Sequence, residues 1–169
     1  EFVPLAGNCG ATVADNSSAF RMNDGVPIVV PAINGGDVAF HRRIIANPNC
    51  TTAVTLMALA PLHRAFGVKR IFASSYQAVS GAGTRAIEEL KTQTKRVSSG
   101  HAPDCDVFPY QIAFNVIPRI DAVQDNFYTK EEMKFPWEGR KILHHPTLRA
   151  TATCVRVPVF RSHAVSLNL

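Results

Sequence analysis

The chain has 169 residues, of which 46% are hydrophobic and 18% charged, and its formal net charge is +5 at pH 7. This length is enough for a compact domain with a sizeable core, and the composition excludes a disordered, collagen-like or coiled-coil protein. No apolar run approaches the roughly 20 residues of a membrane-spanning helix, and we expect no secretory signal. The modest charge suits an enzyme that attracts anionic substrates, whereas the dispersed lysines and arginines do not favour nucleic-acid binding.

Four cysteines lie far apart in the sequence and form no CxxC pair: Cys9, Cys50, Cys105 and Cys154. This spacing argues against a zinc ribbon or a redox dithiol, so we expect no metal site. We expect reduced thiols and a cytoplasmic location, or a plastid if the protein comes from a photosynthetic eukaryote. Neither end of the chain has the pattern of a natural terminus, so we expect an internal piece of a longer protein.

The first part of the chain alternates short apolar runs with polar turns. Strands are predicted at residues 11–15, 26–31 and 44–46, and their continuous apolar character is typical of a parallel sheet covered on both faces. A long helix is predicted after Asn49, with Gly67 at its end and a kink or break at Pro61.

The second part is expected to continue the alternation of strands and helices. Strands are predicted at residues 69–75, 112–117, 151–160 and 166–169, helices at 84–96 and 129–143, a tight turn at 80–83 and a loop at 97–106. Thr129 and Glu132 have the spacing of a capping box, and Pro136 is expected to interrupt the second helix. The whole pattern predicts an α/β fold, or α/β joined to α+β, with a boundary near residues 47–50.

Cys50 is the strongest candidate for chemistry. It follows Asn49, a favourable N-cap, at the start of the long helix, where unpaired N–H groups and the helix dipole favour a thiolate. The same N–H groups can stabilise an oxyanion after the thiolate attacks a carbonyl. The alternative interpretation is a small cysteine buried in the core.

His163 is the candidate general base, because imidazole can take a thiol proton near neutral pH. Arg156 precedes it in an apolar strand, where a buried guanidinium needs an anion: a structural carboxylate or that of a substrate. Seven positions separate these two residues, so in an unbroken strand they would face opposite ways. If both serve one site, the chain must bulge or turn between Pro158 and Ser162.

The other candidates are weaker on their own. Glu138 and Lys141 share a helix face, and a surface ion pair is the simpler interpretation. Arg21 lies just beyond a predicted parallel strand, where open α/β sheets bind ligands. The turn at 80–83 leads into a helix start that suits a phosphate, although no complete dinucleotide-binding or P-loop motif occurs. The remaining histidines are expected at the surface or are unsuited to a metal pair: His41, His63, His101, His144 and His145.

Taken together, six segments resemble aspartate-semialdehyde dehydrogenase, in the order of that family and over essentially the whole chain. The blocks around Cys50 and Gln77 are the most specific, and the block that begins at Glu138 is less so. The segments are DNSSAFRM at 15–22, ANPNCTT at 46–52, SYQAVSGAG at 75–83, IAFN at 112–115, EGRKIL at 138–143 and TCVRVPVFRSH at 153–163.

The resemblance implies a role for each matching residue. It implies that Cys50 is the nucleophile, that His163 is the acid/base and that Gln77 orients the substrate. It implies that Arg156 clamps the substrate carboxylate and that Glu138 is the partner of the substrate amino group. It also implies a phosphate site formed by Arg21, Asn49 and Lys141. Finally, it implies that Ser80 and Gly81 contact NADP.

The implied reaction is the reversible, NADP-dependent conversion of L-aspartyl 4-phosphate into L-aspartate 4-semialdehyde through a cysteine thioester, in lysine, threonine and methionine biosynthesis. The resemblance implies a homodimer, with part of a Rossmann-type NADP-binding domain at residues 1–49 and part of an α+β catalytic and dimerisation domain at residues 50–169. The family's Gly-rich NADP loop has no counterpart here, so we expect this chain not to bind NADP tightly. Gly139 stands where the family usually has threonine, and Pro136 is unexpectedly close to Glu138.

Two rival families and one other class of function remain as alternatives. N-acetyl-glutamyl-phosphate reductase shares the overall plan, but the Gln77 block and the segment 156–163 favour the aspartyl substrate. Glyceraldehyde-3-phosphate dehydrogenase has a histidine where Gln77 stands. An inactive, truncated dimerisation module is the third alternative, and the retained Cys50 and His163 argue against it.

Overall fold

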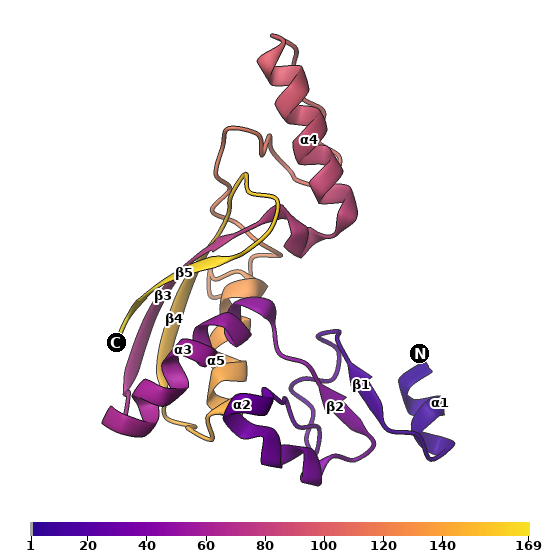
Figure 1. Cartoon of the computed structure of the whole chain (residues 1–169), viewed down its shortest axis with the longest axis vertical. Helices are drawn as coiled ribbons and strands as arrows, with labels where there is room; N and C mark the ends of the chain where they lie inside the picture. The colour runs from indigo at the N-terminus through magenta and orange to yellow at the C-terminus, as the bar shows by residue number, and fades with distance from the viewer. Residues whose placement is uncertain (1) are drawn as a thin grey trace. The chain divides into compact units, whose positions relative to one another are not determined.

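The computed structural model describes residues 2–169, which form two compact units (Figure 1). The first unit contains residues 2–71, 134–151 and 169, and the second contains residues 72–133 and 152–168. Each unit is therefore built from segments that are distant in the sequence. No helix within the described residues is both long and apolar enough to cross a membrane.

The first unit begins with a helix that the sequence patterns do not predict, α1 (Phe2–Asn8), followed by β1 (Val13–Asp15). β1 pairs in parallel with β2 (Ile44–Ala46), which confirms two of the short predicted strands. The third predicted strand, at 26–31, forms only a single parallel bridge, between Ile28 and Ala46. Proline explains this difference, because Pro27 has no N–H to donate and Pro31 begins the short helix α2 (Pro31–Asn34), before the 3₁₀ helix η1 (Gly35–Phe40).

The predicted long helix is present as α3 (Cys50–Phe66), with Asn49 as its N-cap. Gly67 ends it in the left-handed conformation, with φ of 68°. The helix is continuous through Pro61, so the expected break does not occur. Pro61 leaves the carbonyl of Met57 without its helical partner, and both residues are exposed, where water can bond that carbonyl.

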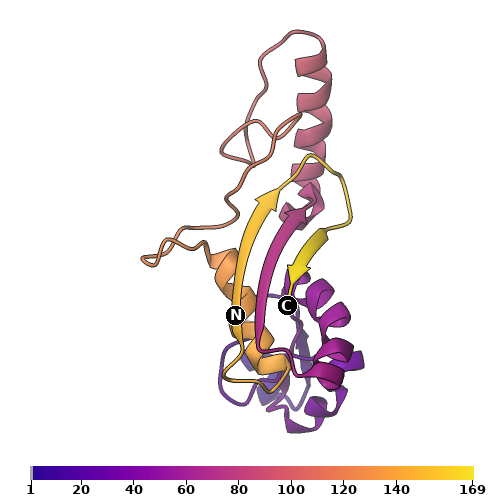
Figure 2. The ribbon, with the colours of Figure 1, turned by 90° about the vertical axis from the view of Figure 1, so that its left-hand side faces the viewer.

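A three-stranded sheet has the order β4–β3–β5, formed by β3 (Arg70–Gln77), β4 (Arg149–Arg156) and β5 (Ala164–Asn168). Figure 2 shows β3 and β4 running in the same direction and β5 in the opposite one. The register of β3 with β5 is antiparallel and pairs Tyr76 with Ala164. β3 buries every second residue, among them Ser75 and Gln77, and exposes Phe72 and Tyr76 on the other face.

The second unit also contains the 3₁₀ helix η2 (Val79–Ala82) and α4 (Thr84–Ser98), which pack on one hydrophobic core. The predicted strand at 112–117 belongs to this core but does not form, except for a bridge between Ile117 and Arg156. A side chain of α4 prevents it: the Gln93 carbonyl oxygen accepts the backbone N–H groups of Ile112 and Ala113, at 2.9 and 3.1 Å. Those N–H groups are thus unavailable to a neighbouring strand.

The helix α5 (Lys130–Ile142) begins with the predicted capping box. The Thr129 N–H donates to the Glu132 carboxylate at 2.7 Å, and the Glu132 N–H donates to the Thr129 hydroxyl at 3.3 Å. The helix continues through Pro136, so the expected interruption is wrong. Phe135 and Pro136 are both buried, and their packing compensates for the missing hydrogen bond. The elements together confirm a mixed α/β fold.

The two glycines Gly139 and Gly67 allow a test of helix geometry, because a Cβ at either would meet no atom within 4 Å. Gly139→Ala is expected to raise the free energy of unfolding by about 0.5–1 kcal/mol, since alanine favours a helix interior. Gly67→Ala is the control and is expected to lower the free energy of unfolding by about 1 kcal/mol, because its φ is positive. Urea denaturation measures both, and the same sign for the two variants would contradict the prediction.

Candidate active site

The start of α3 presents a cysteine thiol at a capped helix end. The side-chain oxygen of Asn49 accepts the backbone N–H groups of Thr51 and Thr52, at 3.0 and 3.2 Å. Cys50 is the first residue of the helix and is exposed, so a molecule from solution can reach its sulfur. The alternative interpretation of Cys50 as a buried core residue is therefore wrong.

A buried carboxylate holds the residue that precedes this cysteine. Glu138, on α5, is 2% exposed; one of its oxygens accepts the backbone N–H of Asn49 at 2.7 Å. Its other oxygen pairs with the Arg21 guanidinium at 3.1 Å, and Arg21 is also buried. Burial raises the pKa of Glu138, while the bond from Asn49 and the charge of Arg21 oppose that rise. Three candidates from distant segments thus share one hydrogen-bond network.

Lys141, one turn further along α5, binds backbone carbonyls rather than Glu138. Its ammonium donates to the carbonyls of Arg21 and Asn23, at 2.7 and 3.0 Å. Burial lowers the pKa of Lys141, and the negative charge of Asp24 opposes this. The simpler interpretation of Glu138 and Lys141 as a surface ion pair is wrong, because Glu138 is buried and pairs with Arg21.

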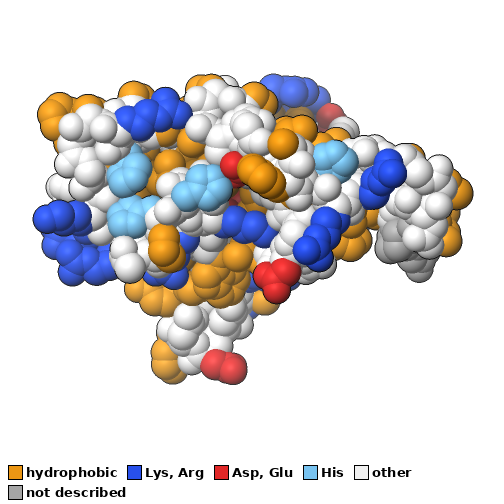
Figure 3. All heavy atoms as spheres, turned by 90° about the horizontal axis from the view of Figure 1, so that it is seen from below, with side chains coloured by type: hydrophobic (Ala, Val, Ile, Leu, Met, Phe, Trp, Pro, Cys, Tyr) orange, Lys and Arg blue, Asp and Glu red, His pale blue; other side chains and the backbone are white. Residues whose placement is uncertain are grey.

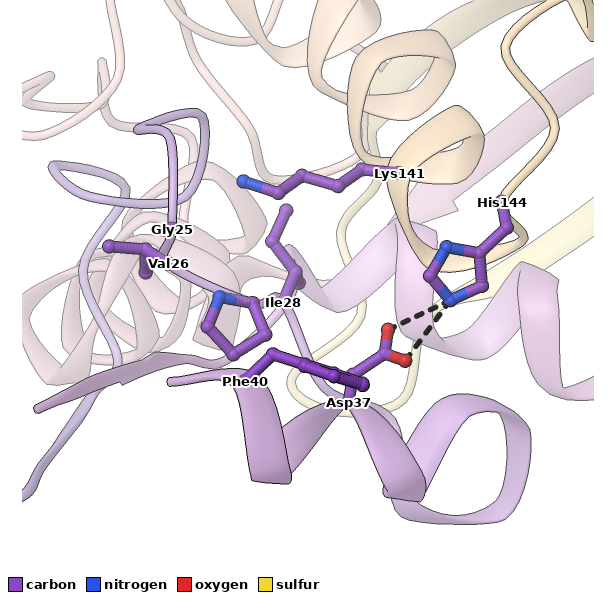
Figure 4. Close-up of a pocket in the computed structure, with 8 residues that line it drawn as sticks. Gly25, Val26, Ile28, Asp37, Phe40, Lys141 and His144 are labelled. Carbon is purple, nitrogen blue, oxygen red and sulfur yellow. Dashed lines mark hydrogen bonds and ion pairs between the residues drawn. The ribbon is translucent and has the colours of Figure 1, made fainter. Parts of the chain in front are cut away.

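Lys141 also borders a cavity of about 310 Å³ in the first unit (Figure 4). The Lys141 side chain extends along one side of this cavity, and His144 points toward Asp37. The His144 ring nitrogen lies 3.0 and 3.1 Å from the two carboxylate oxygens of Asp37. Apolar side chains, including Val26 and Ile28, form much of the remaining wall.

In the second unit, the backbone of Ala78 holds two candidates together. The Ala78 N–H donates to His163 Nδ1 at 3.1 Å, and the Ala78 carbonyl accepts the Arg156 guanidinium at 2.8 Å. Because Nδ1 is the acceptor, the proton of the neutral imidazole lies on Nε2. Arg156 is 6% exposed, and its guanidinium lies over the Phe108 ring, 5.9 Å from the centroid.

The expected turn between Arg156 and His163 is confirmed. β4 ends at Arg156, and the following segment bonds to η2 through the N–H of Val79 and the carbonyl of Val159, at 2.9 Å. Ser162 then takes a φ of 73°, and β5 begins just after His163. This reversal places both side chains on Ala78, which an unbroken strand does not allow.

Gly81, in η2, lies against the same two side chains. A Cβ there would lie 2.9 Å from the Arg156 guanidinium and 3.2 Å from the His163 ring. Glycine at this position therefore permits the close packing of Arg156 and His163. Ser80, its neighbour, is partly buried, and its N–H donates to the carbonyl of Phe160 at 3.2 Å.

The electrostatic environment of His163 lowers its pKa. Burial is the main cause, and the positive charge of Arg156 acts in the same direction. The carboxylate of Glu131, at the start of α5, acts in the opposite direction. At neutral pH these effects favour the uncharged imidazole with its proton on Nε2.

The sequence patterns did not identify Glu131 as a member of this group. It is 7% exposed and accepts a hydrogen bond from the amide nitrogen of Gln77 at 3.2 Å. The capping box does not explain the whole acidic pair at the start of α5, because it uses only Glu132. The sequence signal that pointed to Glu131 was its position as a second acidic residue next to the capping residue Glu132.

The remaining cysteines and histidines lie outside the two groups of candidate site residues. Cys9 and Cys105 are exposed, and Cys154 is buried. The His63 ring stacks on the ring of His145, with centroids 5.2 Å apart. Figure 3 shows histidine side chains close to lysine and arginine side chains on the face seen there. Within residues 2–169 no group of three or more histidine, cysteine, aspartate or glutamate side chains has the arrangement of a metal site.

Comparisons with known proteins agree with the resemblance. The model of the semialdehyde dehydrogenase dimerisation domain matches residues 59–169, well over half of the chain.

The chain belongs to the semialdehyde dehydrogenase family.

Relatives within this family carry the name aspartate-semialdehyde dehydrogenase. The protein of that name from Aquifex aeolicus is 48% identical over 172 aligned residues, which cover 100% of this chain and 51% of the relative. A crystal structure of aspartate semialdehyde dehydrogenase II from Vibrio cholerae, complexed with ASA, has a TM-score of 0.97 at 46% identity, and the match covers 99% of this chain and 50% of that one. The more distant Candida albicans structure, with NADP, has a TM-score of 0.64 at 23% identity, covers 97% of this chain and 45% of that one, and shows the fold alone.

The chain spans about half the length of the curated relatives that it matches. The names of these relatives do not favour the N-acetyl-glutamyl-phosphate reductase alternative. Of the expected site residues, the structure groups Arg21, Asn49, Glu138 and Lys141 in the first unit, together with Cys50. It groups the others in the second unit: Gln77, Ser80, Gly81, Arg156 and His163.

The positive charge of Arg156 beside His163 leads to a prediction for the pKa of His163. Arg156→Gln is expected to raise the pKa of His163, because it removes a positive charge that disfavours the imidazolium. An NMR pH titration measures this, with the His163 signal assigned through a His163→Asn variant. Arg161→Gln is the control, since Arg161 is exposed and is not among the causes of the His163 shift. An unchanged or lower pKa in Arg156→Gln would contradict the prediction.

Proposed function

We propose that the protein carrying this chain is an NADP-dependent aspartate-semialdehyde dehydrogenase. It converts L-aspartyl 4-phosphate into L-aspartate 4-semialdehyde and phosphate, reversibly, as a step in aspartate-family amino-acid biosynthesis. The observation that carries the proposal is the exposed thiol of Cys50 at the capped start of α3. Its support is the family of the chain and the shared name of relatives that are close to half identical to it.

Cys50 is the proposed nucleophile. Its sulfur forms a bond to the acyl carbon of the aspartyl phosphate, and the phosphate leaves with the electrons of the broken C–O bond, so that a thioester remains. Cys50 is the first residue of α3, so the positive end of the helix dipole favours negative charge on the sulfur and on the carbonyl oxygen.

The proposed substrate contacts match the charges of the aspartyl phosphate. Arg156 binds its carboxylate, since a guanidinium can bind both oxygens of that group. Glu138 meets the ammonium group, and the phosphate is bound by the remaining candidates of the first unit: Arg21, Asn49 and Lys141. The network of Glu138 with Arg21 and the Asn49 N–H supports this, because it holds these groups in one place before substrate binds.

Gln77 and His163 are proposed to orient the substrate and to move the proton. The Nε2–H of His163 donates to the substrate oxygen. The imidazolium form supplies the Nε2 proton when the thioester is reduced, and a neutral imidazole is left. In the reverse direction the same nitrogen takes that proton back. Gln77 is 1% exposed and holds the reacting group with its amide.

NADP is the proposed cofactor, and NADPH supplies a hydride when it is bound. Ser80 and Gly81 are proposed to contact it, and they fit this role because Gly81 is exposed and has no side chain to block its backbone. Residues 1–49 are proposed to belong to the NADP-binding domain, with the parallel pair β1–β2 in its sheet. Residues 50–169 are proposed to belong to the catalytic and dimerisation domain.

Replacement of the thiol tests the proposed reaction. Cys50→Ser in the full-length protein is expected to lower kcat for L-aspartate 4-semialdehyde, NADP and phosphate by about 10³-fold or more, because a serine hydroxyl is a poor nucleophile without a strong base. Formation of NADPH, followed by its absorbance, is the measurement. Cys105→Ser is the matched control and is expected to retain activity, since Cys105 lies outside both groups of site residues. Activity that persists in Cys50→Ser would overturn the proposal.

We also propose that the protein is a homodimer and that a second copy covers the exposed face of β3. The family model that matches this region is named for dimerisation. Phe72 and Tyr76 are 47% and 46% exposed there, with Ser74 between them on the same face. Large apolar side chains exposed together are typical of an interaction surface.

A charge on this face is expected to separate the two copies. Tyr76→Asp should shift the protein from dimer to monomer in sedimentation velocity, because an interface core excludes unpaired charge. Tyr110→Asp is the control, since Tyr110 is 59% exposed and lies outside the sheet. A Tyr76→Asp protein that remains dimeric would contradict this use of the face.

A further inference from the structure

We infer that Glu131 is a positioning residue of this site: its buried carboxylate fixes the orientation of the Gln77 amide and places a negative charge near His163. The inference rests on the proposed function, because it concerns residues that are assigned to that reaction. Glu131 itself is not assigned to the reaction by any of the segments that resemble the family.

The first support is the hydrogen bonding of Gln77. Its amide nitrogen donates to the carboxylate of Glu131 and to the hydroxyl of Ser75, both at 3.2 Å. A carboxylate only accepts hydrogen bonds, so it can bind the nitrogen end of the amide but not the oxygen end. The carbonyl oxygen of Gln77 must therefore point away from Glu131, and a flip of the amide is disfavoured.

The second support is burial. Glu131, Gln77 and Ser75 are 7%, 1% and 0% exposed, respectively. A buried carboxylate is costly unless hydrogen bonds compensate it, and here the Gln77 amide supplies one of them. The group is therefore held in one arrangement and does not exchange freely with water.

A purely structural role for Glu131 is the alternative, because acids in the first turn of a helix stabilise it. That role is already filled by its neighbour Glu132, which accepts the Thr129 N–H at 2.7 Å and the Cys154 N–H at 3.2 Å. Glu131 points instead to Gln77. The two neighbouring acids thus serve different parts of the second unit.

The third support is the balance of charge around His163. Arg156 on β4 contributes a positive charge and Glu131 on α5 a negative one, while Ala78 and Gly81 contribute no side-chain charge. The carboxylate favours the protonated imidazole and so opposes burial and Arg156, which lower the pKa of His163. Glu131 thereby keeps that pKa closer to the pH at which the enzyme transfers a proton.

The isosteric variant Glu131→Gln tests the inference in the full-length protein, with Glu132→Gln as the matched control. We expect Glu131→Gln to lower the pKa of His163 in an NMR pH titration, and to lower kcat by between about 10- and 100-fold with a smaller change in KM, because a misplaced amide no longer aligns the reacting group. Glu132→Gln is expected to leave the His163 titration unchanged and to lower only the melting temperature.

Glu131→Asp separates the two effects and guards against a variant that does not fold. It retains the charge, so the pKa of His163 should stay near the original value, but the shorter side chain cannot reach Gln77, so kcat should still fall. The inference is overturned if Glu131→Gln titrates and turns over like the unmodified protein, or if Glu132→Gln shifts His163 equally. The titration is read without turnover, so a failure of the proposed reaction, seen as activity in Cys50→Ser, is distinguishable from a failure of this inference.

Discussion

The hydrogen bonds of the buried Glu138 carboxylate hold together the site residues of the first unit. The carboxylate binds the backbone N–H of Asn49, and Asn49 in turn caps α3 with its side chain. The position of the Cys50 thiol is thus set by a carboxylate that is 88 positions away in the sequence. Arg21 balances its charge, because a buried carboxylate without a cation is strongly unfavourable. This arrangement ties the nucleophile to the residues proposed to bind substrate.

In the second unit the backbone of a single residue, Ala78, holds the site residues in place. Ala78 has no functional side chain, yet its N–H orients His163 and its carbonyl orients Arg156. Ala78 directly follows β3, so its backbone groups have a fixed position. They therefore fix the positions of the His163 and Arg156 side chains. Gly81 completes this packing because it lacks a Cβ. His163 and Arg156 are therefore held in place by Ala78 and Gly81, which have no functional side chains.

Local sequence signals predicted the elements whose ends are chemically marked. Asn49 and Gly67 are a capping residue and a left-handed glycine, and they delimit α3 as expected. Thr129 and Glu132 form the capping box. The strand predicted at 112–117 failed because its apolar pattern cannot show that Gln93, some 20 positions earlier, takes its backbone N–H groups. Pro136 was predicted to interrupt α5 and does not, because packing compensates for the missing hydrogen bond and the local sequence does not show that packing. Pro61 likewise does not break α3.

The sequence by itself determined which residue types were available: a cysteine after an N-cap, an arginine in an apolar strand, and a histidine seven positions later. It also predicted a turn between Arg156 and His163 if both serve one site, because side-chain alternation in a strand is a local property. Only the tertiary structure decided that Glu138 pairs with Arg21 rather than Lys141, and that Glu131 rather than Glu132 binds Gln77. The hydrogen-bond and ion-pair partners of such acids depend on distance and burial in the folded chain. The spacing of residues along the sequence determines neither the distance nor the burial.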